Sequence, residues 1–582
     1  MRMVAVLQYL RPLRLTGPIF DKELRVSSRR RRNYVLRFLY IGFFTMLLAL
    51  TWANVIAHGT SSVFQASRMA AAGLAIMSTV VWFQFLTSQA IAIVMLSTSI
   101  SDEIYHRTLG VLMTTPIGSA QIVLGKLFSK LLQLVLLLAI TLPLLAIVRV
   151  FGGVPWAYLI CSLCVTLTTV AFIGSLSLFF SIFTRRAYVV VLATILMVGF
   201  LFLLLPLLVA FLVYYPAEPT PQFMRLLSYV NPYLLLGMVT QTLIMPMAGG
   251  TANWLVHCGV MSGLSALLLL LATMVVRKVA LRQATGQTGL WSVRGRRAPP
   301  AHRAAGDGLR RVVGPPILWK ERRLPLLGRR RVFAVLGILL VLGILGLTYV
   351  LCDMGDMLDE SEVQEAYIIV FTAIGILFTM VVPATCIASE RESRAWPLLL
   401  TTTVSSGEIL LGKFLGAVYR CLPAWAILFG HVLAFVLAGL IHPVALVHLG
   451  ILAAWLLVFL SSTGLFFSTC LQHTTAAVIA NMALAAGLWA VVPLLLGLAL
   501  VLTRAKDDML GLYVDLNPFV HAGVIAGATA DHGKLGGYSW MQHGISGVAD
   551  ATGWMIVTFI LYAAVGMIFL LLARMRLRSN PF

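Results

Sequence analysis

Charged residues are scarce in this chain of 582 residues, and acidic ones are the scarcest. Only 11% of the residues are charged, against about 25% in soluble domains, and 60% are hydrophobic, against about 45–50%. A water-soluble fold cannot hide so much apolar surface. The composition therefore excludes a soluble globular protein and predicts one embedded in a membrane.

The motifs of several enzyme classes are also missing. The seven cysteines lie scattered, with Cys161 and Cys164 as the only close pair, so neither a disulfide framework nor a zinc site is indicated. The strings His-Glu-x-x-His and Gly-x-Ser-x-Gly do not occur. The nearest approach to a phosphate-binding loop, GEILLGKF (407–414), has Phe414 where Ser or Thr should hold magnesium. We therefore expect no catalytic, cofactor-binding or metal-binding residues in this chain.

Apolar runs long enough to cross a bilayer recur along the chain. A membrane core takes about 20 residues of α-helix. Such windows predict about twelve transmembrane helices, over residues 35–57, 71–98, 126–151, 157–183, 187–213, 251–276, 332–352, 365–388, 413–440, 443–470, 474–502 and 553–574. The predicted fold class is therefore an all-α polytopic membrane protein.

The position of the basic residues explains the net charge of +22. They cluster in residues 1–34 and 277–331, whereas the loop 353–365 has six acidic residues and no basic one. Because basic segments stay on the cytoplasmic side, we expect both termini there and no nucleic-acid partner. The predicted organisation is a cytoplasmic amphipathic interface segment (1–34), a six-span repeat (35–280), a basic linker with a second interface segment (281–331), and a second six-span repeat with a short basic tail (332–582).

Two segments of the chain repeat each other. EIYHRTLGVLMTTPIGSAQIVLGK (103–126) and ERESRAWPLLLTTTVSSGEILLGK (390–413) match at ten of 24 positions without a gap. A shared apolar bias explains matched leucines, but not a matched Glu, Arg, Thr-Thr, Ser and Gly-Lys. A Lys-Glu pair before the first span and an Asn-Pro pair before the last span also recur in each half. The chain is thus an internal duplication, and six spans per half make the two repeats parallel.

The repeated segment lies between the second and third spans of each half. Glu103 and Arg107 are four residues apart, as are their counterparts in the second copy, so we expect an i,i+4 ion pair in a short surface helix. Thr-Thr should end that helix, and Ser119 or Ser406 should cap a second short helix leading into the third span. Such an elbow suits the docking of a soluble partner; the alternative is an element needed only for folding.

This pattern of Glu, Arg, Leu-x-Thr-Thr, a small residue, Ile and Leu-Gly-Lys resembles the signature of permease subunits of ATP-binding-cassette exporters of the type-2 class. The Lys-Glu and Asn-Pro segments are similar to those of that family as well. The resemblance implies the type-2 permease fold. Family permeases commonly have six spans and pair up, so this chain resembles two permease units fused into one.

The resemblance also implies roles for particular residues. Those expected to couple the permease to an ATPase are Glu103, Arg107, Thr114, Thr115, Gly125, Lys126, Glu390, Arg394, Thr401, Thr402, Gly412 and Lys413. Interface helices would carry Lys22, Glu23, Lys320 and Glu321. Short external re-entrant elements would carry Asn231, Pro232, Asn517 and Pro518.

The implied function is ATP-driven export across the cytoplasmic (inner) membrane. Because this chain lacks an ATPase, its implied partners are two copies of an ABC nucleotide-binding subunit, which would hold the ATP and magnesium, together with membrane lipid. Two alternatives remain open. A membrane anchor for an ATPase that does mechanical work elsewhere would share these features, whereas an ion-coupled carrier would need carboxylates inside the spans, which contain essentially none.

The charge bias makes the orientation testable by cysteine labelling in intact cells. A cysteine placed at Asp359 should react with an impermeant maleimide from outside, and one placed at Ala304 only after permeabilisation, because the first loop is acidic and the second basic. The parent chain controls for its own seven cysteines. The reverse labelling pattern would invert the topology.

Overall fold

The computed structural model describes residues 17–28, 31–57, 65–105, 108–113, 115, 117–152, 154–184, 186–214, 220–244, 253–284, 314–322, 331–503, 508–540 and 547–577. Helices make up most of these residues, and the β-type pairing among them is an isolated bridge between Asp531 and Lys534. The chain divides into two compact units, Met1–Ala210 with Ala217–Ala298 and Phe211–Pro216 with Pro299–Phe582. Of the predicted linker over 281–331, residues 285–313 and 323–330 lie outside the described part.

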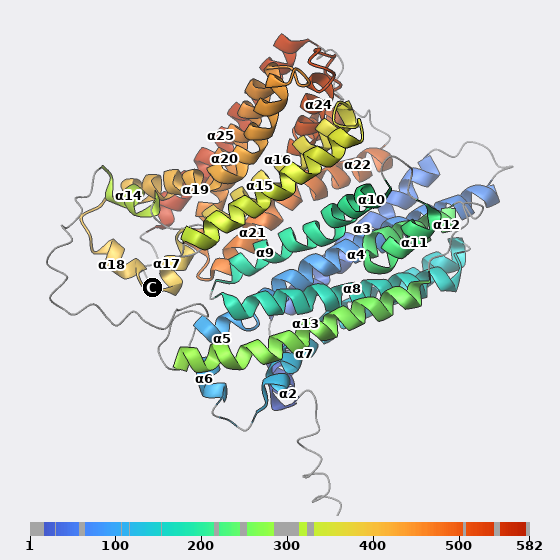
Figure 1. Cartoon of the computed structure of the whole chain (residues 1–582), viewed down its shortest axis with the longest axis horizontal. Coiled ribbons are helices and arrows are strands. Elements are labelled where there is room, and N and C mark those ends of the chain that lie inside the picture. Colours follow the sequence, from blue (N-terminus) through green and yellow to red (C-terminus); the bar gives the residue numbers. More distant parts are fainter. Residues whose placement is uncertain are drawn as a thin grey trace, which may run out of the picture. The chain divides into compact units, whose positions relative to one another are not determined.

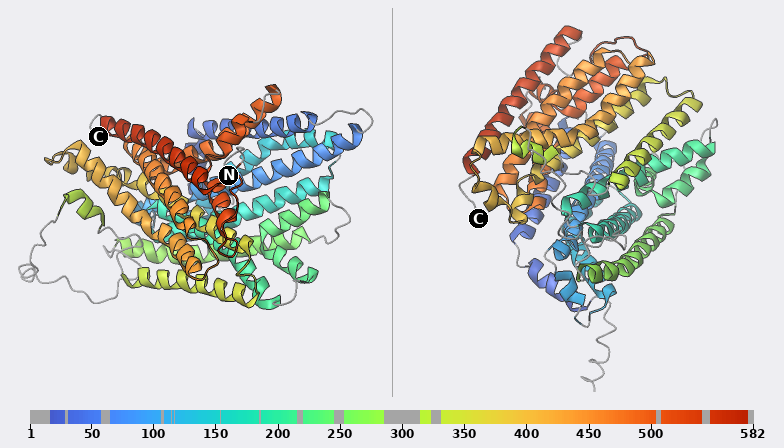
Figure 2. Two further views of the ribbon diagram at one scale, coloured as in Figure 1. Left: turned by 90° about the horizontal axis from the view of Figure 1, so that it is seen from above. Right: turned by 60° about the vertical axis from the view of Figure 1, so that its left-hand side comes forward.

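The first repeat consists of long helices joined by short ones (Figures 1 and 2). Its helices are α2 (Gly17–Ser28), α3 (Arg31–Ala57), α4 (Gln65–Ser97), α5 (Ser101–Tyr105), α6 (Thr108–Met113), α7 (Ser119–Gly152), α8 (Trp156–Phe183), α9 (Ala187–Gly199), α10 (Leu205–Tyr214), α11 (Pro221–Val230), α12 (Pro232–Ile244) and α13 (Trp254–Ala284). Within it α8 packs against α4 and α13, and α4 packs against α7.

The second repeat has the same order of elements. Its helices are α14 (Pro316–Arg322), α15 (Arg331–Met354), α16 (Ser361–Thr385), α17 (Ala388–Glu392), α18 (Trp396–Leu400), α19 (Ser406–Leu437), α20 (Val444–Cys470), α21 (Thr474–Ala486), α22 (Val492–Thr503), α23 (Asp508–Val514), α24 (Pro518–Thr529) and α25 (Val548–Arg576). Within it α20 packs along α25 and α16, as Figure 1 shows.

The predicted spans coincide with helices. Ten helices among the described residues are long and apolar enough to cross a membrane. The other two predicted spans, 35–57 and 332–352, fall on α3 and α15, whose described apolar parts, Arg37–Leu50 and Val341–Met354, are shorter. The all-α polytopic fold class is therefore confirmed.

Aromatic side chains join the helices inside each unit. In the second, the rings of Trp455 on α20 and Tyr562 on α25 stack with centroids 4.2 Å apart. In the first, Phe85 on α4 meets Tyr233 on α12 edge to face at 5.1 Å. Such pairs add to the apolar burial that holds each bundle together.

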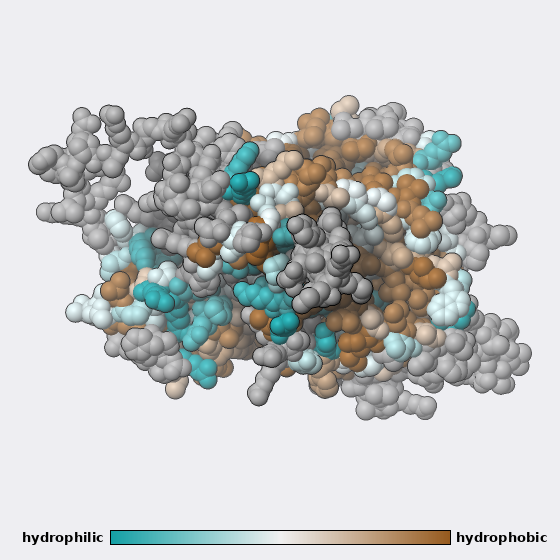
Figure 3. All heavy atoms as spheres, turned by 90° about the horizontal axis from the view of Figure 1, so that it is seen from below, coloured by the Kyte–Doolittle hydropathy of each residue, from teal (hydrophilic) through white to brown (hydrophobic). Residues whose placement is uncertain are grey.

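Other large apolar side chains face outward. Figure 3 shows broad hydrophobic areas on the face that it displays. On α25, for example, Ile560 and Ile568 are more than half exposed. Contiguous apolar surface of this kind suits contact with lipid rather than water, which agrees with a multi-pass membrane protein.

The fifth span of each repeat contains one π-helical turn. The turn η3 (Phe200–Leu204) lies between α9 and α10, and η5 (Gly487–Val491) lies between α21 and α22. A π turn interrupts the regular hydrogen-bond ladder of an α-helix and is common at functional positions. The matched turns extend the duplication beyond the segments in which the sequence shows it.

Candidate functional site

Each repeat bends sharply between its second and third spans, in segments that we call the first elbow (residues 101–118) and the second elbow (residues 388–405). Helices α5 and α6 form the first, and α17 and α18 form the second. Both α6 and α18 end directly before the Thr-Thr pair, as predicted, although Thr114 lies outside the described residues. The hydroxyls of Thr115 and Thr402 each donate to a carbonyl three residues earlier, and Thr401 does the same, which closes the turn.

The ion pair predicted inside the second elbow is wrong. Helix α17 ends at Glu392, and Arg394 follows with a left-handed backbone (φ 55°), so Glu390 and Arg394 are not one helical turn apart. Glu390 instead pairs with lysines from other helices. In the first elbow, Arg107 lies outside the described residues.

The predicted cap of the following helix is also displaced by one residue. Ser405, not Ser406, caps α19: its hydroxyl accepts from the N–H of Glu408 at 3.2 Å, and the Glu408 carboxylate accepts from the N–H of Ser405 at 3.0 Å. This reciprocal pair is a capping box. Helix α19 then continues to Leu437, so the third span begins at once and the second short helix does not form. In the first repeat α7 likewise begins at Ser119 and runs to Gly152.

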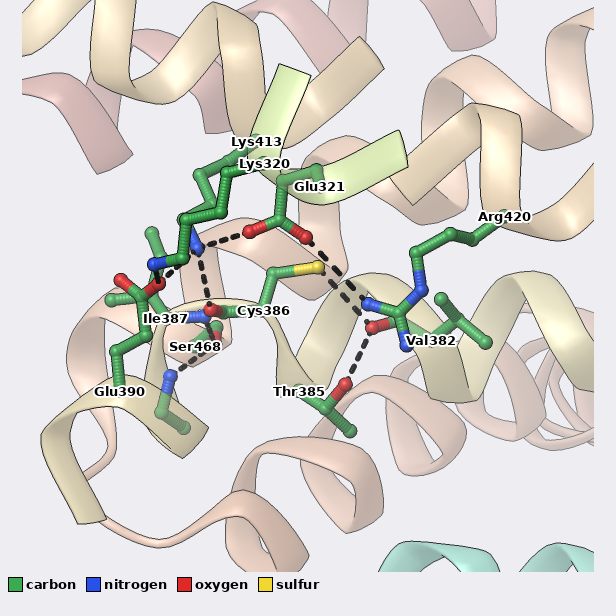
Figure 4. Close-up of polar contacts among 11 residues, drawn as sticks. Lys320, Glu321, Val382, Thr385, Cys386, Ile387, Glu390, Lys413, Arg420 and Ser468 are labelled. Carbon is green, nitrogen blue, oxygen red and sulfur yellow. Dashed lines mark hydrogen bonds and ion pairs between the residues drawn. The ribbon is translucent and has the colours of Figure 1, made fainter. Parts of the chain in front are cut away.

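A buried ionic cluster links three elements of the second repeat (Figure 4). The ammonium of Lys413, on α19, lies 2.5 Å from the Glu321 carboxylate on α14 and 2.6 Å from that of Glu390 on α17. Lys413 also donates to the carbonyl of Cys386, and Lys320 pairs with Glu390 at 2.6 Å. Because Lys413 and Glu321 are each 1% exposed, α14, the second elbow and the third span share one desolvated charge network.

Arg420, further along α19, belongs to the same cluster. Its guanidinium lies 3.8 Å from the second carboxylate oxygen of Glu321, and its side chain is 8% exposed. A cation two helical turns beyond Lys413 therefore faces the same carboxylate. The network contains three cations and two carboxylates.

The first repeat has a matching cluster with looser geometry. Lys126, on α7, lies 3.1 Å from Glu103 in the first elbow and 3.9 Å from Glu23 on α2. Lys130, one turn further along α7, lies 3.5 Å from Glu23. Both carboxylates are more exposed than those of the second cluster, at 24% for Glu23 and 22% for Glu103. The interface helix, the elbow and the third span are thus joined in both repeats.

The charges fix the conformation of the elbow more than they add to stability. A buried ion pair gives little net stabilisation over an apolar packing, but removing one partner typically costs about 3–5 kcal/mol because the other charge is left unpaired. The Lys413 ammonium pairs with carboxylates from both α14 and α17, so displacing either helix would remove a partner from a buried charge. Movement of either helix is therefore opposed by the whole network.

The pKa of Glu103 reports on the first cluster. Burial alone would raise the pKa of this carboxyl, but the charge of Lys126 and hydrogen bonds from Thr108 and Lys126 outweigh that effect. The pKa of Glu103 therefore lies below its ordinary value. Its contribution to stability is present at neutral pH and is lost as the pH falls through the folded-state pKa.

The predicted glycines precede the two central lysines. Gly412 lies where α14 crosses α19, and a Cβ there would come within 2.9 Å of the Ile317 side chain. Gly125 is buried at the equivalent place on α7. Lys22, predicted as an interface residue, is exposed on α2 and interacts with Glu103 through its charge.

The predicted Asn-Pro elements connect to the π turns. Helices α12 and α24 begin at Pro232 and Pro518, and the amide oxygens of Asn231 and Asn517 accept hydrogen bonds from the first N–H groups of these helices. Their amide nitrogens donate to carbonyls in η3 and η5, at 2.6 Å and 2.9 Å. One side chain therefore caps the short helix and ties it to the fifth span in each repeat.

Each elbow also exposes an apolar side chain that its sequence pattern did not single out. Val111 on α6 is 66% exposed and Leu398 on α18 is 72% exposed. Their positions correspond in the aligned repeats. The comparison of the two repeats did not identify Lys130 and Arg420 either. Lys130 aligns with Ala417 and Arg420 aligns with Gln133, so neither is a matched position.

Among the residues that the structure describes, no group of three or more His, Cys, Asp or Glu side chains is placed to hold a metal ion. The elbow carboxylates pair with lysines of neighbouring helices, Glu103 with Lys126 and Glu390 with Lys320 and Lys413. The described site joins helices and presents a surface.

Comparison with known proteins agrees with this architecture. Residues 18–281 match the model of the family described as ABC-2 family transporter protein, a match that extends from α2 to α13. No curated protein matches the chain. The second repeat carries the same elements and the same ionic cluster, and the length suits two fused units. The first repeat is therefore identified as a unit of the ABC-2 transporter family, which supports a membrane permease component of an ABC transporter as the role of the chain.

Proposed function

We propose that this chain is a complete translocation path for an ATP-driven exporter of the cytoplasmic membrane, with both termini in the cytoplasm. Two copies of a separate nucleotide-binding subunit would dock on its two elbows and supply the ATP and magnesium. The family implies association with ATP-binding subunits. The duplicated elbows are the reason for proposing two copies, the basic segments for placing the termini in the cytoplasm, and the resemblance to type-2 exporters for proposing export.

The observation that carries the proposal is the pair of ionic clusters. Lys126 and Lys413 each join an interface helix, an elbow and the third span. A force applied to either elbow would therefore be transmitted to a membrane helix through ion pairs, which are desolvated at Lys413 and Glu321, rather than through a flexible loop. Val111 and Leu398, exposed at the elbows and framed by the Thr-Thr turns, suit two identical apolar sockets on a soluble partner.

Purification of the chain from its native membrane in mild detergent tests the partner. We expect an ATPase subunit to copurify at two copies per chain, measured by native mass spectrometry, because each elbow offers one docking surface. Replacing Val111 and Leu398 together by Asp should abolish the association, whereas Asp at Met357, an exposed residue in the loop between α15 and α16, should leave it intact. Transport by the chain alone would refute the proposal.

Charge reversal at the two elbow glutamates tests coupling. The double variant Glu103→Lys, Glu390→Lys should insert normally but lower the transport-dependent ATPase rate on the order of tenfold or more. A buried charge left without its partner costs about 3–5 kcal/mol. Because about 1.4 kcal/mol changes an equilibrium constant tenfold, this cost should make the coupled conformation of the elbow at least tenfold rarer.

The matched control is Asp21→Lys, which reverses an exposed carboxylate on α2. This control should retain the full rate. Size-exclusion chromatography of both variants separates uncoupling from misfolding. An unchanged rate in the double variant would remove the elbows from the coupling mechanism.

A further inference from the structure

The interface helix of the second repeat follows the third span over about one helical turn. A Cβ at Gly412 would lie 2.9 Å from the Ile317 side chain. A Cβ at Gly416 would collide with the Glu321 side chain. These contacts are four residues apart on both α14 and α19, so the two helices lie side by side and run in the same direction. Arg322, the last residue of α14, therefore lies one residue further along the third span.

The guanidinium of Arg322 lies over an aromatic ring of the third span. Its Cζ is 4.8 Å from the centroid of the Tyr419 ring. Arg322 is exposed and Tyr419 is 44% exposed, so the pair lies on the surface of the unit and not in its core. The ring attracts the cation through its π face, and the guanidinium keeps N–H groups that can donate to another molecule.

Tyr419 belongs to an apolar stripe along α19. It shares one face of the helix with three leucines at helical spacings, Leu411, Leu415 and Leu422. Each of these leucines is at least 41% exposed. A row of exposed leucines on a membrane span suits contact with lipid chains. Arg322 therefore places a cation beside a surface that faces acyl chains.

This cation has no anionic partner in the part of the chain that the structure describes. The salt bridges found there do not include Arg322, and residues 323–330, which follow it outside the described part, contain no Asp or Glu. Glu408 is the only acidic residue of α19. It lies about three helical turns before Tyr419, where its carboxylate belongs to the capping box.

The neighbouring ionic cluster increases the excess of positive charge. It holds three cations and two carboxylates, and Arg322 adds a further cation beside it. Basic groups of this kind at a membrane surface attract anionic lipid headgroups. A zwitterionic headgroup would bring a phosphate but would leave the excess charge unchanged.

We propose that the junction of α14 and α19 is a binding site for an anionic phospholipid. The lipid phosphate accepts hydrogen bonds from the Arg322 guanidinium, whose fork of N–H groups matches phosphate oxygens. One acyl chain lies along Leu415 and Leu422. Tyr419 is the positioning residue, since its ring holds the guanidinium at the edge of the apolar stripe. In the proposed orientation the lipid belongs to the cytoplasmic leaflet.

A lipid at this place would act on the ionic cluster. Glu321, one residue before Arg322, faces both Lys413 and Arg420. A lipid bound to Arg322 and to the leucines of α19 bridges the interface helix and the third span from outside. It therefore stabilises the same contact that the buried charges make from inside.

Native mass spectrometry of the full chain tests the site. The chain is released from nanodiscs made of equal parts of phosphatidylglycerol and phosphatidylcholine. We expect phosphatidylglycerol to be retained in preference to phosphatidylcholine, and Arg322→Gln to lower its retained fraction severalfold, because the variant removes the charge that pairs with the phosphate. The measurement requires no ATPase, so it does not depend on the proposed function.

The matched control is Arg277→Gln, which removes the same charge from an exposed arginine near the end of α13 in the first repeat. This control should retain phosphatidylglycerol as the parent chain does. Equal retention by Arg322→Gln and the parent would overturn the proposal. An equal loss in the two variants would overturn it as well, since it would show a general effect of net charge.

Thermal unfolding in detergent tests the role of Tyr419 and of the apolar stripe. Phosphatidylglycerol should raise the unfolding midpoint of the parent chain and of Arg277→Gln, but not that of Arg322→Gln. Tyr419→Leu should reduce the shift; leucine suits this place because Leu132 occupies the matched position on α7. Inorganic phosphate should give no shift, because it cannot contact the leucines. A shift with phosphate alone, or a full shift in Tyr419→Leu, would contradict the site as assigned.

Discussion

A lysine ammonium that is almost completely buried must be surrounded by acceptors, and in this protein the acceptors come from different elements. Lys413 stands on the third span, but Glu321 and Glu390 belong to the interface helix and to the elbow. Neither helix α14 nor helix α17 has more than seven residues, so neither is stable by its own hydrogen bonds. The buried charge holds them in place, and the shape of the docking surface depends on that constraint.

The duplication shows which parts of this arrangement are required. Both repeats keep the lysine at the start of the third span, the carboxylate of the elbow and the carboxylate of the interface helix. The third cation differs, being Lys130 in one repeat and Arg420 in the other, yet it faces the interface carboxylate in both. Each network therefore has a further cation beside the carboxylate of the interface helix, although this cation lies at different positions of the third span in the two repeats. At the other end of the bundle, Asn231 and Asn517 make the same pair of contacts to a capped helix and a π turn.

Hydropathy was sufficient to predict the twelve helices, since a span leaves a long apolar run, and the matched segments showed which polar residues mattered. The pairing of those residues could not be predicted. Glu390 has Arg394 four residues away and Lys413 much further along the chain, and the left-handed backbone at Arg394 decides between them. The π turns have no sequence signal, because FLFLL and GLWAV read as ordinary apolar helix. Arg420 has no basic counterpart in the first repeat, and only the fold shows that it lies beside Glu321.

The central claim is that the interface helix and the third span are energetically coupled through Lys413. A double-mutant cycle on the full chain in one detergent, with Lys413→Met, Glu321→Gln and their combination, measures this through thermal unfolding midpoints. The account predicts that the combined variant is clearly more stable than the sum of the two losses, with a coupling on the order of 0.5–3 kcal/mol, because each single change strands a buried partner. Additive losses would contradict it.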